Sequence, residues 1–98
     1  MASRADGARM TEALIRLDSI RDYPADRERG WPAQTSVTYQ VGDCQAGFFV
    51  RPESVIRTRE GRAFLHVTIT HQTPQWVHFL VDGCWGTADR GSVVATKG

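Results

Sequence analysis

The 98-residue chain has no asparagine, one lysine (Lys97) and only two cysteines. Without asparagine there is no N-glycosylation acceptor and no Asn-Gly hairpin turn, so tight turns must use Asp-Gly, Glu-Gly or Pro. No apolar run approaches the roughly 20 residues of a membrane span. Residues 1–10 lack the apolar stretch of a secretory signal. We therefore expect a protein that is cytoplasmic or part of an assembled particle such as a virion.

A surplus of charge of one sign is also missing. Twelve Lys and Arg are balanced by eleven Asp and Glu, which gives a formal net charge of +1. Proteins dedicated to nucleic acid carry a basic surplus, because neutralising phosphates supplies much of their affinity. We therefore expect nucleic acid not to be the main partner. The hydrophobic share, 41%, is ordinary for one small globular domain.

The two cysteines, Cys44 and Cys84, are too few for a disulfide framework. A single bond between them would close a long loop and stabilise the fold. Because no secretory signal is present, two free thiols in a reducing compartment are the favoured interpretation.

From Ser36 onward the sequence is typical of β-structure. Short alternating or apolar runs are separated by turn signals, of which Asp82-Gly83 is the strongest. The expected strands are 36–41, 48–50, 55–56, 64–70, 75–81 and 93–94, with a loop over 86–91. Six short strands in about sixty residues predict a mainly β fold, either a small antiparallel β-barrel or a sandwich.

The N-terminal third gives a weaker signal. Residues 1–9 predict a flexible arm, and 22–34 predict a long exposed connection. Residues 10–21 fit either a short helix, from the spacing of Met10, Ala13, Leu14, Leu17 and Ile20, or a strand, because Ala13, Ile15 and Leu17 alternate. The expected organisation is an N-terminal arm and connection over 1–34, followed by a β-barrel domain over 35–98.

The central hairpin predicts which side chains face inward. Strand alternation points Leu65, Val67 and Ile69 into the core together with Val77, Phe79 and Val81. The opposite face carries His66, Thr68 and Thr70 beside Trp76, His78 and Leu80. Trp76 and Leu80 make this face unusually apolar for solvent, so either a second layer of the domain or a partner subunit covers it.

Catalytic and metal-binding patterns are weak. His66 and His78, expected as cross-strand neighbours, could bind a metal with Cys84, but their spacing matches no zinc motif. Cys44 has no group nearby in sequence that would activate it as a nucleophile. The acidic residues lie in turns or among arginines. We expect no catalytic residue, no metal and no cofactor, and hence no enzyme; a small metal- or thiol-dependent enzyme is the alternative.

A second alternative is a small barrel that binds single-stranded nucleic acid. Such barrels stack bases on aromatic rings within a basic groove. The rings available for this are Trp76, Trp85, Phe48 and Phe49, and the nearby arginines are Arg51, Arg57, Arg59 and Arg62.

Two adjacent stretches carry a family resemblance. Arg51-Pro52-Glu53-Ser54-Val55-Ile56, followed by Arg59 to Val67, resembles the Pro-x-Ser-Ala-Val strand, glycine turn and aromatic-Val-x-Val strand of periplasmic adaptor (membrane-fusion) proteins. The resemblance covers residues 48–98 and implies a β-barrel assembly module. The lipoyl half-motifs and helical hairpin of that family are missing, so no transport function and no site residue is carried over.

Together these patterns predict a non-enzymatic assembly module that binds other protein subunits, for example a capsid decoration or connector subunit of a virion. Trp31, between Gly30 and Pro32, either covers one end of the core or anchors a partner. The expected interface residues are Trp31, Trp76, His78, Leu80, His66 and Trp85.

Overall fold

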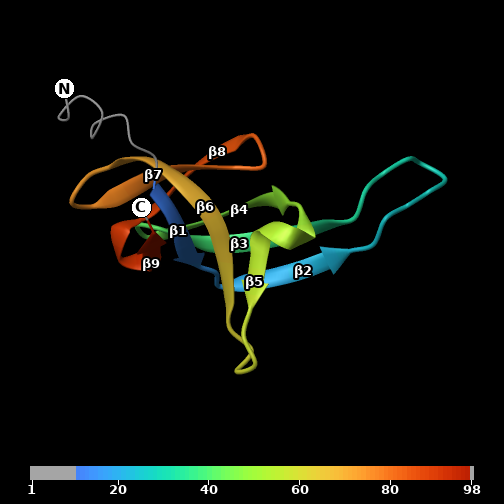
Figure 1. Cartoon of the computed structure of the whole chain (residues 1–98), viewed down its shortest axis with the longest axis horizontal. Helices are drawn as coiled ribbons and strands as arrows, with labels where there is room; N and C mark the ends of the chain where they lie inside the picture. The colour runs from blue at the N-terminus through green and yellow to red at the C-terminus, as the bar shows by residue number, and fades with distance from the viewer. Residues whose placement is uncertain (1–10, 98) are drawn as a thin grey trace.

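The computed structural model describes residues 11–97, with side chains up to residue 94, and this part contains nine strands (Figure 1). They are β1 (Thr11–Arg16), β2 (Ser19–Tyr23), β3 (Gln34–Val41), β4 (Cys44–Val50), β5 (Val55–Arg57), β6 (Ala63–Gln72), β7 (Trp76–Val81), β8 (Cys84–Asp89) and β9 (Val93–Lys97). Two single 3-10 turns, η1 (Pro52–Ser54) and η2 (Arg90–Ser92), precede β5 and β9.

The strands form two antiparallel sheets. The larger has the order β8-β7-β6-β1-β9, with β5 paired to the beginning of β6, and the smaller has the order β2-β3-β4. The mainly β prediction is confirmed. The sheets pack on each other without closing into a barrel, so the barrel alternative is wrong.

The N-terminal third departs most from expectation. The described part of the ambiguous segment, residues 11–21, does not form a helix: β1 lies between β6 and β9, and β2 pairs with β3. The alternation of Ala13, Ile15 and Leu17 decides the outcome, because all three are buried only in a strand arrangement. Residues 11–23 thus belong to the sheets and not to an arm; the expected arm over 1–9 lies outside the described residues.

The chain passes from one sheet to the other within a single peptide unit. The Leu17 amide donates to the Ala63 carbonyl of β6 at 3.1 Å, whereas the Asp18 amide donates to the Thr38 carbonyl of β3 at 2.8 Å. Both backbone donors are therefore satisfied at the crossing, which lets β1 and β2 follow each other directly in different sheets.

One further strand was missed at the other end of the chain. Residues 86–91 were expected as a loop, but β8 continues to Asp89 and pairs with β7 from Val81 to Trp76. The Asp82-Gly83 turn that joins them has positive φ at both residues, as the hairpin prediction requires. Gly86 and Ala88 have weak β-propensity. Once the turn fixes the register, pairing with β7 nevertheless holds them in a strand.

The core lies between the two sheets. The six side chains predicted to face inward from β6 and β7 are all buried, which confirms the register of the central hairpin. Phe79 of the larger sheet contacts two rings of the smaller one, Tyr39 at 5.8 Å and Phe48 at 6.3 Å between centroids. These aromatic contacts are the centre of the sandwich.

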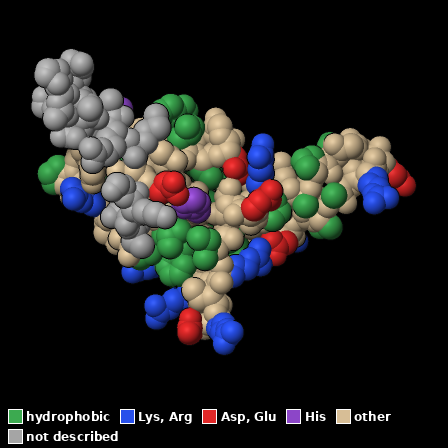
Figure 2. Space-filling view, viewed as in Figure 1, with side chains coloured by type: hydrophobic (Ala, Val, Ile, Leu, Met, Phe, Trp, Pro, Cys, Tyr) green, Lys and Arg blue, Asp and Glu red, His purple; other side chains and the backbone are tan. Residues whose placement is uncertain are grey.

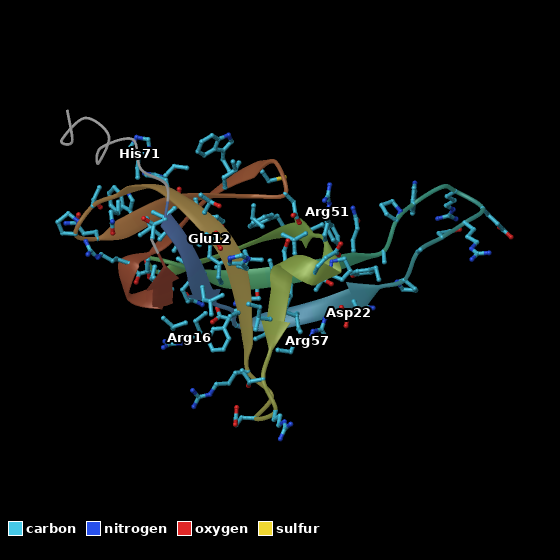
Figure 3. All side chains as sticks on the ribbon, in the orientation of Figure 1. Glu12, Arg16, Asp22, Arg51, Arg57 and His71 are labelled. Atoms are coloured by element: carbon cyan, nitrogen blue, oxygen red, sulfur yellow. The ribbon has the colours of Figure 1, made fainter. Side chains whose placement is uncertain are left out.

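Polar side chains tie the sheets together at their margins. Asp22 of β2 and Arg57 of β5 point toward one another and form a two-pronged ion pair (Figure 3). Asp82 accepts hydrogen bonds from the Arg51 amide at 2.6 Å and the Ser54 hydroxyl at 2.9 Å. Asp89 accepts one from the Gly42 amide at 2.7 Å. Each carboxylate joins segments from different parts of the chain.

The connection between β2 and β3, residues 24–33, projects away from both sheets, and charged side chains gather at its tip (Figures 1 and 2). A bridge between Asp26 and Trp31 closes it, and the Asp26 carboxylate accepts the Glu28 and Arg29 amides. The prediction of an exposed connection is confirmed here. Trp31 is 58% exposed, so the alternative in which it covers the core is wrong.

Candidate interaction surface

The outward side of β7 and β8 carries the tryptophans that the sequence singled out. Trp76, His78 and Leu80 alternate along β7 with buried side chains, and Thr87 and Trp85 lie opposite His78 and Leu80 on β8. Together with His71 of β6, these residues are called the Trp–His face below. Four of the six predicted interface residues thus share one continuous surface.

A bulge in β6 decides which histidine joins this face. The pairing of β6 with β7 shifts between Ile69 and His71, so that His71 lies opposite His78. Their rings are 6.5 Å apart in an edge-to-face arrangement. The expectation that His66 and His78 are cross-strand neighbours is wrong, because the register pairs Thr68 with Leu80 and His71 with His78, which leaves His66 without a partner on β7.

His66 lies on the same side of the larger sheet but near the beginning of β6. Its Nε2 atom is 2.9 Å from the Glu12 carboxylate of β1, a contact at the surface of the molecule. Figure 3 places Glu12 toward the middle of the sheet and His71 toward the end of the hairpin. His66 is therefore outside the Trp–His face.

The polar atoms of the Trp–His face bond to one another. The Trp76 indole N–H donates to Nε2 of His78 at 3.1 Å. Because Nε2 accepts this bond, the neutral imidazole carries its proton on Nδ1, which lies 2.9 Å from the Thr87 hydroxyl. Hydrogen bonds at both nitrogens hold the His78 ring, and they fix its tautomer and its orientation.

The apolar part of the Trp–His face is open. Trp76 is 42% exposed and Trp85 is 68% exposed, and the half-buried Leu80 lies opposite Trp85. A shallow pocket of about 450 Å³ lies between His71, His78 and Trp85. No second layer formed by residues 11–94 covers these indoles, so the corresponding alternative is wrong for the described chain.

Trp31 lies apart from this face, in the projecting 24–33 connection, where it pairs with Asp26 beside the turn over 27–30. The Arg29 guanidinium lies 5.0 Å from the centroid of its ring, a cation–π contact that leaves most of the indole accessible. Trp31 is therefore a second exposed indole, separate from the Trp–His face.

The acidic and thiol groups have structural explanations or no converging partners. Hydrogen bonds from Arg57 and Thr35 hold the pKa of Asp22 below its ordinary value, and the same ion pair raises the pKa of Arg57. Burial raises the pKa of the Tyr39 hydroxyl, opposed by the Thr87 amide. Cys44 and Cys84 are free, which is the interpretation favoured from the sequence, and both are exposed. Among the described residues no three His, Cys, Asp or Glu side chains converge as a metal site would require.

The rings expected to form a nucleic-acid platform divide between two sheets. Phe48 packs in the core against Tyr39 and Phe79, whereas Phe49 faces outward from β4. Phe49 instead contacts Tyr23 of β2, with 5.6 Å between ring centroids, and the Arg21 guanidinium lies 5.3 Å from the Tyr23 ring. Tyr23 and Arg21 were not predicted, although their spacing with Ser19 marks the outward side of a strand.

Two members of the Trp–His face, His71 and Thr87, were also not predicted as site residues. The alternation of Trp85, Thr87 and Asp89 is the signal that could have found Thr87.

No helix among residues 11–97 is long and apolar enough to span a membrane. The chain matches no protein-family model, and neither a curated protein nor a solved structure is significantly similar to it.

Proposed function

We propose that this protein is a non-enzymatic assembly module that binds another protein subunit through the Trp–His face. The supporting observation is the exposure of Trp76 and Trp85 on one sheet surface, where Trp85 lies opposite Leu80 and His78 lies between Leu80 and Trp76. Tryptophan is strongly enriched among the residues that dominate protein–protein binding energy. A virion that carries decoration or connector subunits is one example of such an assembly.

The hydrogen bonds within the face favour burial under a partner. Covering an unpaired polar group costs free energy, because the group loses its water without gaining a new bond. Here both ring nitrogens of His78 and the Trp76 N–H already have partners. A protein surface could therefore cover the face without having to supply polar groups that match these three atoms.

The first test is the mass of the protein in solution. If the partner is a second copy, sedimentation equilibrium gives a mass above the 10.9 kDa monomer, and Trp85→Ala restores the monomer. Phe49→Ala is the matched control, because Phe49 is 52% exposed on the other sheet and should leave the mass unchanged.

If the protein is a monomer, the partner is a different subunit. A photo-crosslinking amino acid in place of Trp85 should then form a covalent adduct with one protein in the source cells, and the same group in place of Phe49 should not. A monomer that forms no adduct from position 85 contradicts the proposal, as does an equal effect of the two alanine variants.

A second candidate function is binding of single-stranded nucleic acid on the outward side of β2–β3–β4. The contacts among Arg21, Tyr23 and Phe49 favour it, because bases stack on exposed rings and phosphates pair with arginine. Fluorescence anisotropy with a labelled oligothymidylate at low salt tests it. Binding that Phe49→Ala weakens and Trp85→Ala leaves unchanged would support this function, and no binding at low salt would exclude it.

A further inference from the structure

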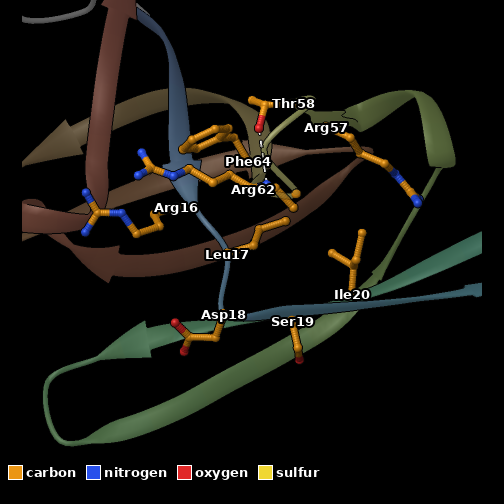
Figure 4. A pocket seen from close by; sticks show the side chains of 11 residues that line it. Arg16, Leu17, Asp18, Ser19, Ile20, Arg57, Thr58, Arg62 and Phe64 are labelled. Carbon is orange, nitrogen blue, oxygen red and sulfur yellow. Dashed lines mark hydrogen bonds between the residues drawn. The ribbon is translucent and has the colours of Figure 1, made fainter.

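A pocket of about 700 Å³ lies where the chain crosses between the sheets, beside the hairpin that joins β5 to β6 (Figure 4). Its walls come from the β1–β2 crossing and from both arms of the hairpin. It is at the beginning of β6, whereas His71 of the Trp–His face is near the end of that strand. The two sites are therefore separate. The lining residues are Arg16, Leu17, Asp18, Ser19, Ile20, Arg57, Thr58, Gly61, Arg62, Ala63 and Phe64.

The apolar part of this pocket comes from Leu17, Ile20 and Phe64. Leu17 is buried at the crossing, and Ile20 and Phe64 are each half-buried, so part of each side chain remains available to a ligand. Ligand pockets commonly combine an apolar surface of this kind with a few polar groups that fix orientation.

The charged part is dominated by arginine: three arginines and one aspartate line the pocket. Arg57 is already paired with Asp22, and its side chain extends away from the other two in Figure 4. The side chains of Arg16 and Arg62 extend toward the same side of the pocket. Neither guanidinium forms an ion pair or hydrogen bond with another described residue.

Asp18 does not neutralise these two arginines through a direct contact. Its Oδ2 atom accepts hydrogen bonds from the side-chain amides of Gln40 at 2.6 Å and Gln45 at 3.2 Å. These partners belong to β3 and β4 of the smaller sheet, so the Asp18 carboxylate is held toward that sheet. Arg16 and Arg62 are left as two forks of donors beside an apolar surface.

We propose that this pocket binds a small organic anion, with a carboxylate or phosphate held by Arg16 and Arg62 and an apolar or aromatic part against Leu17, Ile20 and Phe64. The planar guanidinium matches both kinds of anionic group through paired N–H donors. The apolar contacts distinguish such a ligand from inorganic phosphate. This proposal does not depend on the Trp–His face.

The test is an NMR titration of the full chain with benzyl phosphate and with phenylacetate, which supply the two anionic groups on a similar apolar part. Inorganic phosphate and benzyl alcohol are the controls, since each carries only one half of the proposed chemistry. We expect amide shifts at residues 16–20 and 57–64 with at least one of the two probes. Binding of inorganic phosphate and benzyl alcohol should be about tenfold weaker or undetectable.

Arg16→Gln and Arg62→Gln should each weaken that binding about tenfold, because each removes charge-assisted hydrogen bonds. Arg59→Gln is the matched control: Arg59 is in the same hairpin, is exposed and does not line the pocket. All three side chains are exposed, so the spectra of the variants should remain those of the folded protein. The proposal is overturned if neither probe binds, if inorganic phosphate binds equally well, or if Arg59→Gln weakens binding as much as the other two.

Discussion

Arg57 and Asp22 join the two sheets through two parallel hydrogen bonds, at 2.6 and 3.0 Å between guanidinium nitrogens and carboxylate oxygens. The second partner of Asp22 is Thr35, whose buried hydroxyl donates to the same carboxylate at 2.9 Å. Because β5 belongs to one sheet and β2 and β3 to the other, this group of three side chains fixes one margin of the sandwich.

This ion pair predicts a dependence of stability on pH. The pKa of Asp22 is lowered in the folded protein, so its contribution is fully present above the unfolded value of about 3.9. The contribution is lost as the pH falls through the lower folded value. Urea denaturation at pH 6 and pH 3 should show a smaller loss of stability in Asp22→Asn than in the wild type. The loss of stability in Arg57→Gln should lie between these two, because Thr35 still donates to Asp22. An equal loss of stability between pH 6 and pH 3 in all three proteins would contradict this explanation.

Gly86 provides a second prediction, because its missing side chain makes room for the aromatic core. A Cβ atom there would meet the Phe79 ring, with Cε1 at 2.6 Å, and the Tyr39 hydroxyl at 3.1 Å. Gly86→Ala should lower the free energy of unfolding by about 1–3 kcal/mol through overpacking. Gly91→Ala is the control, since nothing lies within 4 Å of its Cβ position, and should change stability by less than about 0.5 kcal/mol. Equal urea midpoints for Gly86→Ala and Gly91→Ala would contradict this prediction, because they would show that the core accommodates the added methyl group.

Asp82 provides a third prediction, because it combines a positive φ with two hydrogen bonds to the segment around η1. Asp82→Ala removes both acceptors and puts a less suitable residue in the left-handed region, so we expect a loss of about 1–3 kcal/mol. Asp82→Asn keeps one carbonyl acceptor and tolerates this backbone conformation, so it should lose less. Chemical denaturation of the two variants measures the difference in their free energy of unfolding. An identical loss in both would show that the charge of Asp82, and not its hydrogen bonds, accounts for the effect.

The cysteines give a fourth prediction. Because Cys44 and Cys84 are free and exposed, both thiols should react with a thiol-specific reagent in the native protein. The double variant Cys44→Ser, Cys84→Ser should keep the melting temperature under reducing and oxidising conditions, since no native cross-link is lost. If a reductant lowers the melting temperature of the wild type but not that of the double variant, the wild type contains a disulfide.

Strand alternation gave the core of the central hairpin correctly because both strands are long and one side of each is fully apolar. The same reasoning failed for β8, because Gly86, Ala88 and Asp89 have little β-propensity and interrupt the signal of Trp85 and Thr87. That strand exists because the turn before it returns the chain along β7. The propensity of a segment alone carries no information about a partner that is already in place.

The candidate sites divide in the same way. Trp76, His78, Leu80 and Trp85 could be assigned to one surface because they follow regular alternation from a strong turn. His71 could not, because a bulge changes its side of the strand without a glycine or proline to mark it. Arg16 and Arg62 are far apart in sequence, and they line one pocket only through the pairing of β1 with β6.

The position of β1 also determines when the larger sheet can be completed during synthesis. On one side Thr11 to Arg16 pair with Ile69 to Phe64, and on the other side Glu12 to Ile15 pair with Lys97 to Val93. At the ribosome, β1 must therefore wait until β9 has emerged before both of its edges are paired. Until then one edge of β1 has no partner, and an unpaired strand edge can pair with another chain.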